Sequence, residues 1–271
     1  MHEEKYALVT HSRDPRFLAL RSLQTPEGRF RTGLYLIEGI RHVALAVEHH
    51  APIRSLFVEP SVLSNPFGRK LARKLRKSGV PGLRLSRPLY HVLTLAAAPR
   101  GIGAVVRQQW TPIAGVRPER NSFWLALESI DSPGNLGTIV RTAEATGVAG
   151  IFLIGEDADP FDPAAVRASM GSLFSQRLVQ CTARELTDWA RSSLASVIAS
   201  SPAGLLDYRA LPCRWPAVLL MGSEKLGLSE YLTETADFTV RIPMLGSCDS
   251  INVAVAAGVL LYELFNQRRG L

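Results

Sequence analysis

The second half of the chain repeats one pattern, in which a short apolar segment of strand length precedes a segment with helical spacing of apolar residues. The strand-like segments cover residues 123–127, 150–154, 194–199, 218–221 and 238–242, and the last helical segment covers residues 252–265. Such alternation is typical of a mainly parallel sheet with helices on both faces. It restricts this half of the chain to an open α/β fold.

The first half alternates in the same way over about a hundred residues, which is an ordinary domain size. Between the halves, residues 110–120 contain two prolines and one glycine and show no periodicity. We therefore predict a smaller α/β domain over residues 1–108, a linker over residues 109–120 and a larger domain over residues 121–271.

The charge of the chain is divided unevenly between these parts. Residues 1–120 hold 20 Lys and Arg against 8 Asp and Glu, whereas residues 121–271 hold 11 against 16, so that net charges of +12 and −5 make up the total of +7. A basic domain joined to a mildly acidic one indicates that the first part binds a polyanion such as RNA. A basic surface that serves only solubility is the alternative.

Residues 69–77 form the most basic segment, and its leucines at four-residue spacing predict a helix that leaves its charges outward. Such side chains contact a nucleic-acid backbone without reading its sequence, although each could equally be a solvated surface residue. Two further arginines lie near an expected loop. The candidate RNA-binding residues are Arg29, Arg31, Arg69, Lys70, Arg73, Lys74, Arg76 and Lys77.

Several classes of site are poorly supported. The chain lacks a phosphate-binding Gly-x-x-x-x-Gly-Lys motif, and Cys181, Cys213 and Cys248 are far apart, so we expect free thiols and no metal. All six histidines lie in the first half, which leaves the second half without an imidazole base. We expect no membrane span, and without a signal peptide we expect a cytoplasmic protein.

Three glycine-containing segments of the second half, residues 132–141, 219–228 and 242–256, each begin where a strand is predicted to end. Ligands of open parallel sheets bind at these strand ends, and glycine allows the backbone to approach them. In the first segment, Asn135 is placed to cap the following helix. Taken singly, the three segments could be a capped helix, an ordinary turn and a core or subunit-interface helix.

Their order is more specific. Asn135-x-Gly137-x-x-x-Arg141, then Gly222-Ser223-Glu224-x-x-Gly227, then Ile242-Pro243-Met244 with a later Ser-Ile-Asn-Val resembles the SPOUT superfamily, in its branch of RNA 2′-O-ribose methyltransferases. The resemblance runs from residue 123 to the C-terminus and includes residues 167–174. Through Phe30, residues 36–39 and the strand near Phe57, the first domain is similar to the ribosomal-protein-like substrate domain often fused ahead of it.

The resemblance implies a deep C-terminal trefoil knot, a homodimer, and S-adenosylmethionine held largely by backbone groups near Gly222, Ile242, Met244 and Ile251. It implies rRNA or tRNA as the substrate, in a housekeeping or an antibiotic-resistance role. A guanidinium group is a poor base, so we expect Arg141 to orient the reactants and stabilise the developing alkoxide, and Glu224 to organise its loop or Asn135. The matching polar residues are Asn135, Arg141, Glu224, Ser250 and Asn252.

We weigh three functions. A 2′-O-ribose methyltransferase is favoured over a base-directed RNA methyltransferase by Asn135, Arg141 and residues 250–252. A non-catalytic RNA-binding protein is disfavoured because all the matching polar positions are retained.

Overall fold

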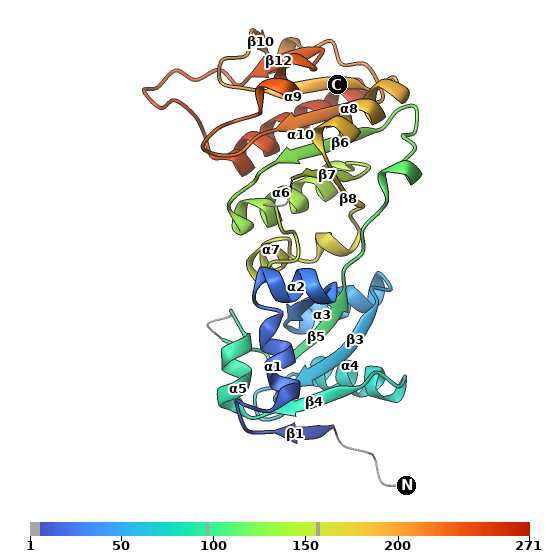
Figure 1. Ribbon diagram of the computed structural model, residues 1–271, viewed down its shortest axis with the longest axis vertical. Coiled ribbons are helices and arrows are strands. Elements are labelled where there is room, and N and C mark those ends of the chain that lie inside the picture. The colour runs from blue at the N-terminus through green and yellow to red at the C-terminus, as the bar shows by residue number, and fades with distance from the viewer. Residues whose placement is uncertain (1–5, 96–97, 156–157) are drawn as a thin grey trace. The chain divides into compact units, whose positions relative to one another are not determined.

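The computed structural model describes residues 6–95, 98–155 and 158–271 (Figure 1). Contacts divide the chain into two compact units. The first unit consists of Met1–Gln108 with Phe161–Phe174, and the second consists of Gln109–Pro160 with Ser175–Leu271. The first unit therefore includes a segment that the sequence assigned to the larger domain.

The second unit contains a seven-stranded sheet in the order β10-β12-β9-β11-β6-β7-β8. Every neighbouring pair is parallel, which confirms the predicted α/β fold with a parallel C-terminal sheet. The strand order does not establish the trefoil knot, which stays a prediction. The strands are β6 (Phe123–Glu128), β7 (Ile151–Ile154), β8 (Leu178–Cys181), β9 (Ser196–Ser200), β10 (Leu206–Asp207), β11 (Ala217–Met221) and β12 (Phe238–Arg241).

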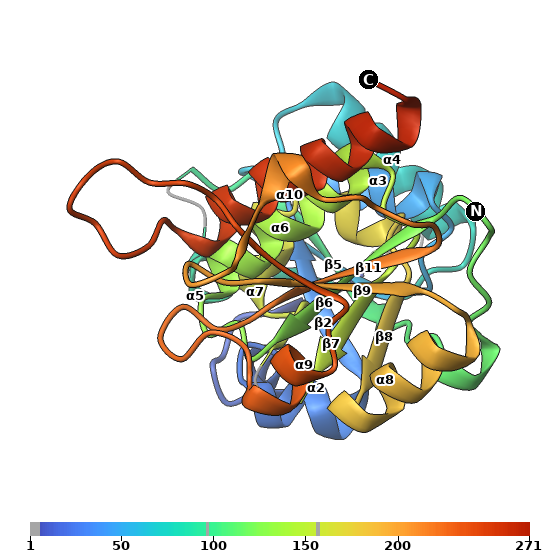
Figure 2. The same cartoon turned by 90° about the horizontal axis from the view of Figure 1, so that it is seen from above.

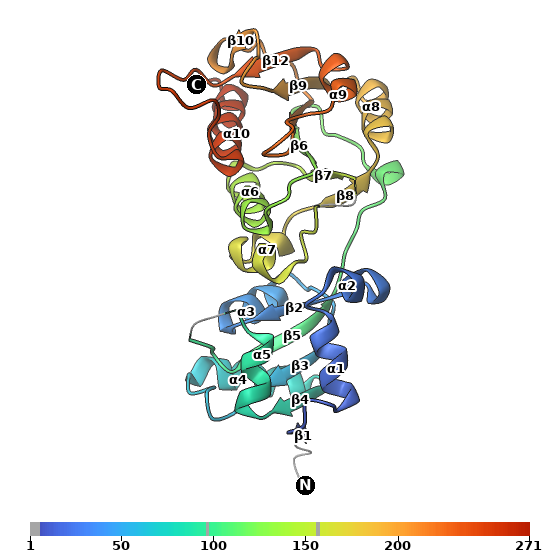
Figure 3. The ribbon, with the colours of Figure 1, turned by 60° about the vertical axis from the view of Figure 1, so that its left-hand side comes forward.

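Helices cover both faces of this sheet, as Figures 2 and 3 show from two directions. On one face α6 (Pro133–Thr146) packs against α10 (Val253–Arg269), and on the other lie α8 (Ala183–Ser192) and α9 (Glu230–Glu234). The cap of α6 is Ser132, whose hydroxyl accepts a bond from the Asn135 N–H, so the expectation that Asn135 caps this helix is wrong. In the described part of the chain, no helix is long and apolar enough to cross a membrane.

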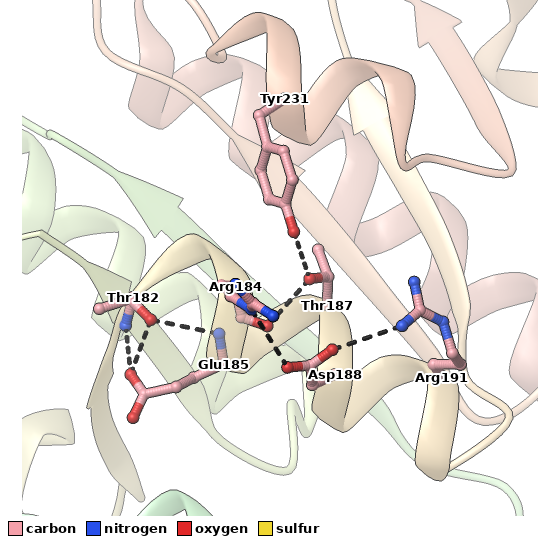
Figure 4. Close-up of polar contacts among 7 residues, drawn as sticks. All are labelled: Thr182, Arg184, Glu185, Thr187, Asp188, Arg191 and Tyr231. Atoms are coloured by element: carbon pink, nitrogen blue, oxygen red, sulfur yellow. Dashed lines mark hydrogen bonds and ion pairs between the residues drawn. The ribbon is translucent and has the colours of Figure 1, made fainter.

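A polar cluster joins α8 to α9 (Figure 4). Thr182 and Glu185 form a capping box at the start of α8, and the hydroxyls of Thr187 and Tyr231 lie 2.9 Å apart. Nearby, Asp188 lies between Arg184 and Arg191, but these side chains are exposed and such pairs contribute little stability. The Thr187–Tyr231 contact holds α9 in place, and with it the end of the loop that follows β11.

The linker prediction requires correction. Residues 109–120 belong to the second unit and include a short 3-10 helix, Ile113–Gly115. Val116 is fully buried and its carbonyl accepts a bond from Trp189 Nε1 (3.1 Å), while the Thr111 N–H bonds to the Leu178 carbonyl. The two prolines interrupt regular structure in this segment, but they do not prevent it from packing.

The first unit contains a five-stranded mixed sheet in the order β1-β4-β3-β5-β2. β5 is antiparallel to β2 and β3, whereas the remaining pairs are parallel. Helices α1 and α5 share a core on one face, and α3 and α4 cover the other (Figure 1). The elements are β1 (Ala7–Val9), α1 (Pro15–Ser22), α2 (Pro26–Thr32), β2 (Leu34–Glu38), α3 (Ile40–Glu48), β3 (Ile53–Val58), α4 (Pro66–Lys77), β4 (Gly82–Leu85), α5 (Arg87–Leu93), β5 (Ile102–Arg107) and α7 (Pro163–Ala168).

Helix α2 occupies the place where the sequence suggested a loop, and it buries one candidate RNA contact. Arg29 is only 2% exposed, and its guanidinium donates to the Leu23 carbonyl (3.0 Å) and to Asp162 Oδ2 (3.1 Å). Asp162 caps α7 within the same unit. The expectation that Arg29 is free to contact RNA is therefore corrected, since its charge is used inside the unit.

Candidate cofactor and catalytic site

The three glycine-containing segments of the second half meet at one edge of its sheet. Because the strands are parallel, the carboxyl ends of β6, β9, β11 and β12 lie at the same edge of the sheet, and the loops that follow these strands begin there. The loop after β6 leads into α6, the loop after β11 leads to α9, and the loop after β12 leads into α10. The five predicted catalytic residues lie either in these loops or in α6, the helix that the loop after β6 leads into.

A cavity of about 610 Å³ opens at this edge. The four predicted cofactor contacts, Gly222, Ile242, Met244 and Ile251, all lie on its wall. Its volume is typical of a site for a small organic ligand. The further apolar residues of the wall are Pro202, Met221, Leu226, Leu228, Val240, Val253, Ala256 and Leu260.

Part of the cavity wall escaped the sequence analysis. Ser200, Ser201 and Pro202 line it from the end of β9, and Thr233 lines it from α9. Strand β9 lies between β11 and β12, so its end must open at the same edge. The rule used for the other three loops would have identified the small polar turn after β9 as well.

Gly222 and Gly227 shape the turn after β11. The Ser223 N–H bonds to the Gly227 carbonyl (3.1 Å), and the Gly227 N–H bonds back to the Ser223 carbonyl (3.0 Å). A Cβ on Gly222 would lie 2.0 Å from the Gly227 carbonyl carbon, and Gly227 has a φ of +69°. Both glycines are therefore required by the turn itself, in addition to any approach of a ligand to the backbone.

A chain of hydrogen bonds joins three of the predicted catalytic residues. Asn135 Nδ2 donates to Glu224 Oε1 (2.8 Å), and Asn252 Nδ2 donates to Asn135 Oδ1 (3.2 Å). Glu224 Oε2 also accepts a long bond from the Asp131 N–H (3.4 Å), while Lys225 Nζ lies 3.4 Å from Asp131 Oδ2. The loops after β6, β11 and β12 are thus tied together at the rim of the cavity.

Asn252 also caps the last helix. Its Oδ1 accepts from the N–H groups of Ala254 (2.9 Å) and Val255 (3.3 Å), which makes it the cap of α10. Ser250, two residues earlier, is exposed and lines the cavity. The polar end of this motif therefore sets the start of the last helix and faces the ligand space.

Arg141 is not part of this chain of bonds. It lies on α6 six residues after Asn135, which places it on a different side of the helix. Its side chain is exposed and has no hydrogen-bond or ion-pair partner among the residues that the structure describes. The structure brings Asn135, Glu224, Ser250 and Asn252 together and leaves Arg141 facing solvent.

No cluster of three or more His, Cys, Asp or Glu residues that could hold a metal occurs in the described ranges. Burial raises the pKa of the Cys181 and Cys213 thiols to about 12, so both are poor nucleophiles. The polar side chains of the predicted site are the amides of Asn135 and Asn252, the carboxylate of Glu224, the hydroxyl of Ser250 and the guanidinium of Arg141.

Two family models match the chain in separate parts. The SpoU rRNA Methylase family matches residues 122–262, and the MRM3-like substrate binding domain matches residues 14–104. The chain belongs to the SpoU rRNA methylase family. It is an RNA methyltransferase that uses S-adenosylmethionine and modifies a ribose 2′-hydroxyl, which confirms the sequence-based choice of this branch.

Relatives of known activity and known structure are similar over nearly the whole chain. A 23S rRNA (uridine(2479)-2′-O)-methyltransferase of Streptomyces viridochromogenes is 33% identical over 95% of this chain and 91% of its own length. A 23S rRNA (guanosine(2553)-2′-O)-methyltransferase of Bacillus subtilis, RlmP, is 27% identical over 90% and 93%. The crystal structure of an AdoMet-bound rRNA methyltransferase from Sinorhizobium meliloti superposes with a TM-score of 0.87 at 33% identity, covering 98% of both chains.

Proposed function

We propose that this protein methylates a ribose 2′-hydroxyl of 23S rRNA, with the methyl donor bound in the cavity of the second unit. The observation that carries the proposal is the position of the Glu224–Asn135–Asn252 hydrogen bonds at the rim of that cavity. The two relatives described above act on 23S rRNA, which favours rRNA over tRNA. Housekeeping and antibiotic-resistance roles are both compatible with these properties.

The cavity fits S-adenosylmethionine in size and in chemistry. Ile242, Met244 and Ile251 provide apolar surface for an adenine ring, and the turn at Gly222 exposes backbone groups. Ser200 and Ser201 add hydroxyl groups from the end of β9. S-adenosylmethionine, when bound, supplies an electrophilic methyl group on its sulfonium.

The residues of the rim position the reacting ribose. Asn135 is oriented by Glu224 and Asn252, so its amide presents a fixed pattern of donor and acceptor. Ser250 is free to bond a sugar hydroxyl at the cavity mouth. The barrier to methyl transfer falls mainly through such positioning and through removal of the hydroxyl proton.

Arg141 acts by holding the RNA backbone and by stabilising negative charge on the attacking oxygen. Its guanidinium is exposed and unpaired among the described residues, so no internal carboxylate must be displaced before it binds. The RNA itself is held by Arg31 and by the exposed cations of α4. Two of the predicted contacts on α4 differ from the others: Arg69 also donates a hydrogen bond to the Leu63 carbonyl, and Arg76 is half-buried.

The protein works as a homodimer whose interface includes α10. This helix exposes Val255 and Tyr262 by 56% and 49%, and it packs beside α6, which carries Arg141. If a second copy of the chain buries this apolar surface, the α6 and α10 helices of that copy come close to the site of the first. The cytoplasmic location expected from the sequence remains a prediction.

Transfer of labelled methyl from S-adenosylmethionine to purified 23S rRNA, 16S rRNA and tRNA tests the proposal, with Arg141→Ala as the comparison. The wild-type protein should label 23S rRNA at a ribose, which makes the adjoining 3′ linkage resistant to alkali. The variant should give little label. Label on a base, or label only on tRNA, would overturn the proposed reaction or the proposed substrate respectively.

A further inference from the structure

Helix α4 begins with an exposed aromatic side chain that the core does not use. Phe67, the second residue of α4, is 57% exposed. The helix packs inward through Gly68, Leu71 and Leu75 instead. Exposing most of a phenyl ring to water is unfavourable, so the packing of the helix does not explain why an aromatic residue lies here.

The residues that follow Phe67 on the same side of the helix are cations. Phe67, Lys70, Lys74 and Lys77 are spaced by three, four and three residues, which aligns them along one side over about 15 Å. Arg73 extends this basic side, and α4 contains no acidic residue. Within residues 6–95, 98–155 and 158–271, the side-chain charges of Lys70, Arg73, Lys74 and Lys77 make no ion pair or hydrogen bond.

The start of α4 is held in place. Asn65 Oδ1 accepts from the N–H groups of Phe67 (2.9 Å) and Gly68 (3.1 Å), and Arg69 Nε donates to the Leu63 carbonyl (2.7 Å). A Cβ on Gly68 would lie 2.9 Å from Cδ1 of both Ile40 and Leu63, so the helix lies directly against its neighbours there. Phe67 therefore stands on a fixed backbone, which lowers the entropy lost when its ring is covered.

We propose that Phe67 stacks on an unpaired base of the RNA substrate while Lys70, Lys74 and Lys77 neutralise the adjoining phosphates. The proposal rests on the proposed function, in which α4 binds RNA, and adds that the bound RNA is single-stranded at this point. An unneutralised row of cations next to the ring suits a polyanion that carries flat aromatic groups. Stacking on an aromatic side chain accepts any base, whereas a base inside a duplex offers no free face.

Binding of two labelled probes tests the proposal: a single-stranded oligoadenylate of about 12 nucleotides and an RNA duplex of equal length. Phe67→Leu keeps an apolar side chain but removes the ring, and should weaken single-strand binding by about five-fold or more. Binding of the duplex should stay unchanged. Phe67→Tyr should bind both probes like the wild type, because it restores the ring.

Leu18→Ala is the control, since Leu18 is 46% exposed on α1, which covers the opposite face of the same sheet. It should leave both affinities unchanged. The stacking proposal is overturned if Phe67→Leu binds the single strand like the wild type, if both probes weaken equally, or if Leu18→Ala has the same effect.

A triple variant with Lys70, Lys74 and Lys77 changed to Ala distinguishes the stacking proposal from the proposal that α4 binds RNA. We expect it to bind both probes more weakly and with a shallower dependence on salt. If it does so while Phe67→Leu has no effect, α4 binds RNA without stacking and only the present inference fails. If the triple variant binds like the wild type, α4 is not the RNA surface and both proposals fail.

Discussion

Asn135 illustrates how a single side chain can join segments that lie far apart in the sequence. Its amide donates to Glu224 and accepts from Asn252, residues that are 89 and 117 positions away. An aspartate would lose the donor, and an alanine would lose both bonds. The type of residue at this position is therefore determined by its neighbours in space, whatever it also does for the substrate.

Arg141→Lys tests the role of the second predicted catalytic residue on α6. A lysine keeps the charge but cannot hold a phosphate or an alkoxide with two parallel bonds, so we expect turnover to fall about tenfold or more. Affinity for S-adenosylmethionine should be unchanged, as should affinity for RNA to within a few fold. Arg184→Lys, on the exposed side of α8, should retain full activity. Full turnover by Arg141→Lys would contradict the proposed role.

At the scale of elements, each loop at the carboxyl edge of the second sheet depends on the next. The turn after β11 is closed by its own backbone bonds, and Glu224 at its tip holds the start of α6. Thr187 and Tyr231 hold α9 at the other end of the same loop. The shape of the cavity is therefore a property of several elements together.

Gly222→Ala should disturb this turn, because the added methyl group would meet the Gly227 backbone at 2.0 Å. Since the turn lines the cavity, we expect about a tenfold or greater loss of S-adenosylmethionine affinity, measured by calorimetry. Gly246→Ala is the control: nothing lies within 4 Å of a Cβ there. Equal affinities of the two variants would show that the turn can open without cost to the cavity.

The ion pair between α2 and α7 should matter for stability. Arg29→Ala leaves the Asp162 carboxylate without its buried partner, and since Asp162 is 24% exposed we expect a loss of about 2–3 kcal/mol in the free energy of unfolding. Urea denaturation measures this change. Arg31→Ala, the exposed neighbour on α2, should stay within about 0.5 kcal/mol of the wild type. A wild-type midpoint for Arg29→Ala would contradict the argument.

At the scale of the whole molecule, charge is separated between the two units. The first unit holds 19 Lys and Arg against 8 Asp and Glu, a net +11, while the second holds 12 against 16, a net −4. By net charge, the unit that carries α4 therefore attracts a polyanion more strongly than the unit that carries the cavity. Binding of RNA and binding of the cofactor should respond differently to salt.

If four cations of α4 neutralise phosphates of single-stranded RNA, raising salt from about 50 to about 200 mM should lower RNA affinity roughly 50-fold. Affinity for S-adenosylmethionine should change by less than about twofold, because the cofactor carries a single net charge and lacks the row of phosphates whose counterions RNA releases on binding. Anisotropy and calorimetry at the two salt concentrations provide the comparison. RNA binding that is insensitive to salt would exclude a backbone-contact role for this surface.

Local patterns were enough to predict much of this molecule. The alternation of strands and helices predicted the parallel sheet, and the leucine spacing predicted α4. The same patterns identified the loops at the strand ends, including Gly222 and Glu224. These features depend on residues close together in the chain, so their periodicity and order suffice to identify them.

Only the tertiary structure decided which residues meet. It placed Arg29 inside the first unit with Asp162, 133 positions away, and it assigned Phe161–Phe174 to that unit. It added the turn after β9 to the cavity and left Arg141 outside the hydrogen-bonded chain. The physical reason is that burial and pairing depend on partners distant in sequence, and no local pattern specifies which distant residue will lie beside a given side chain.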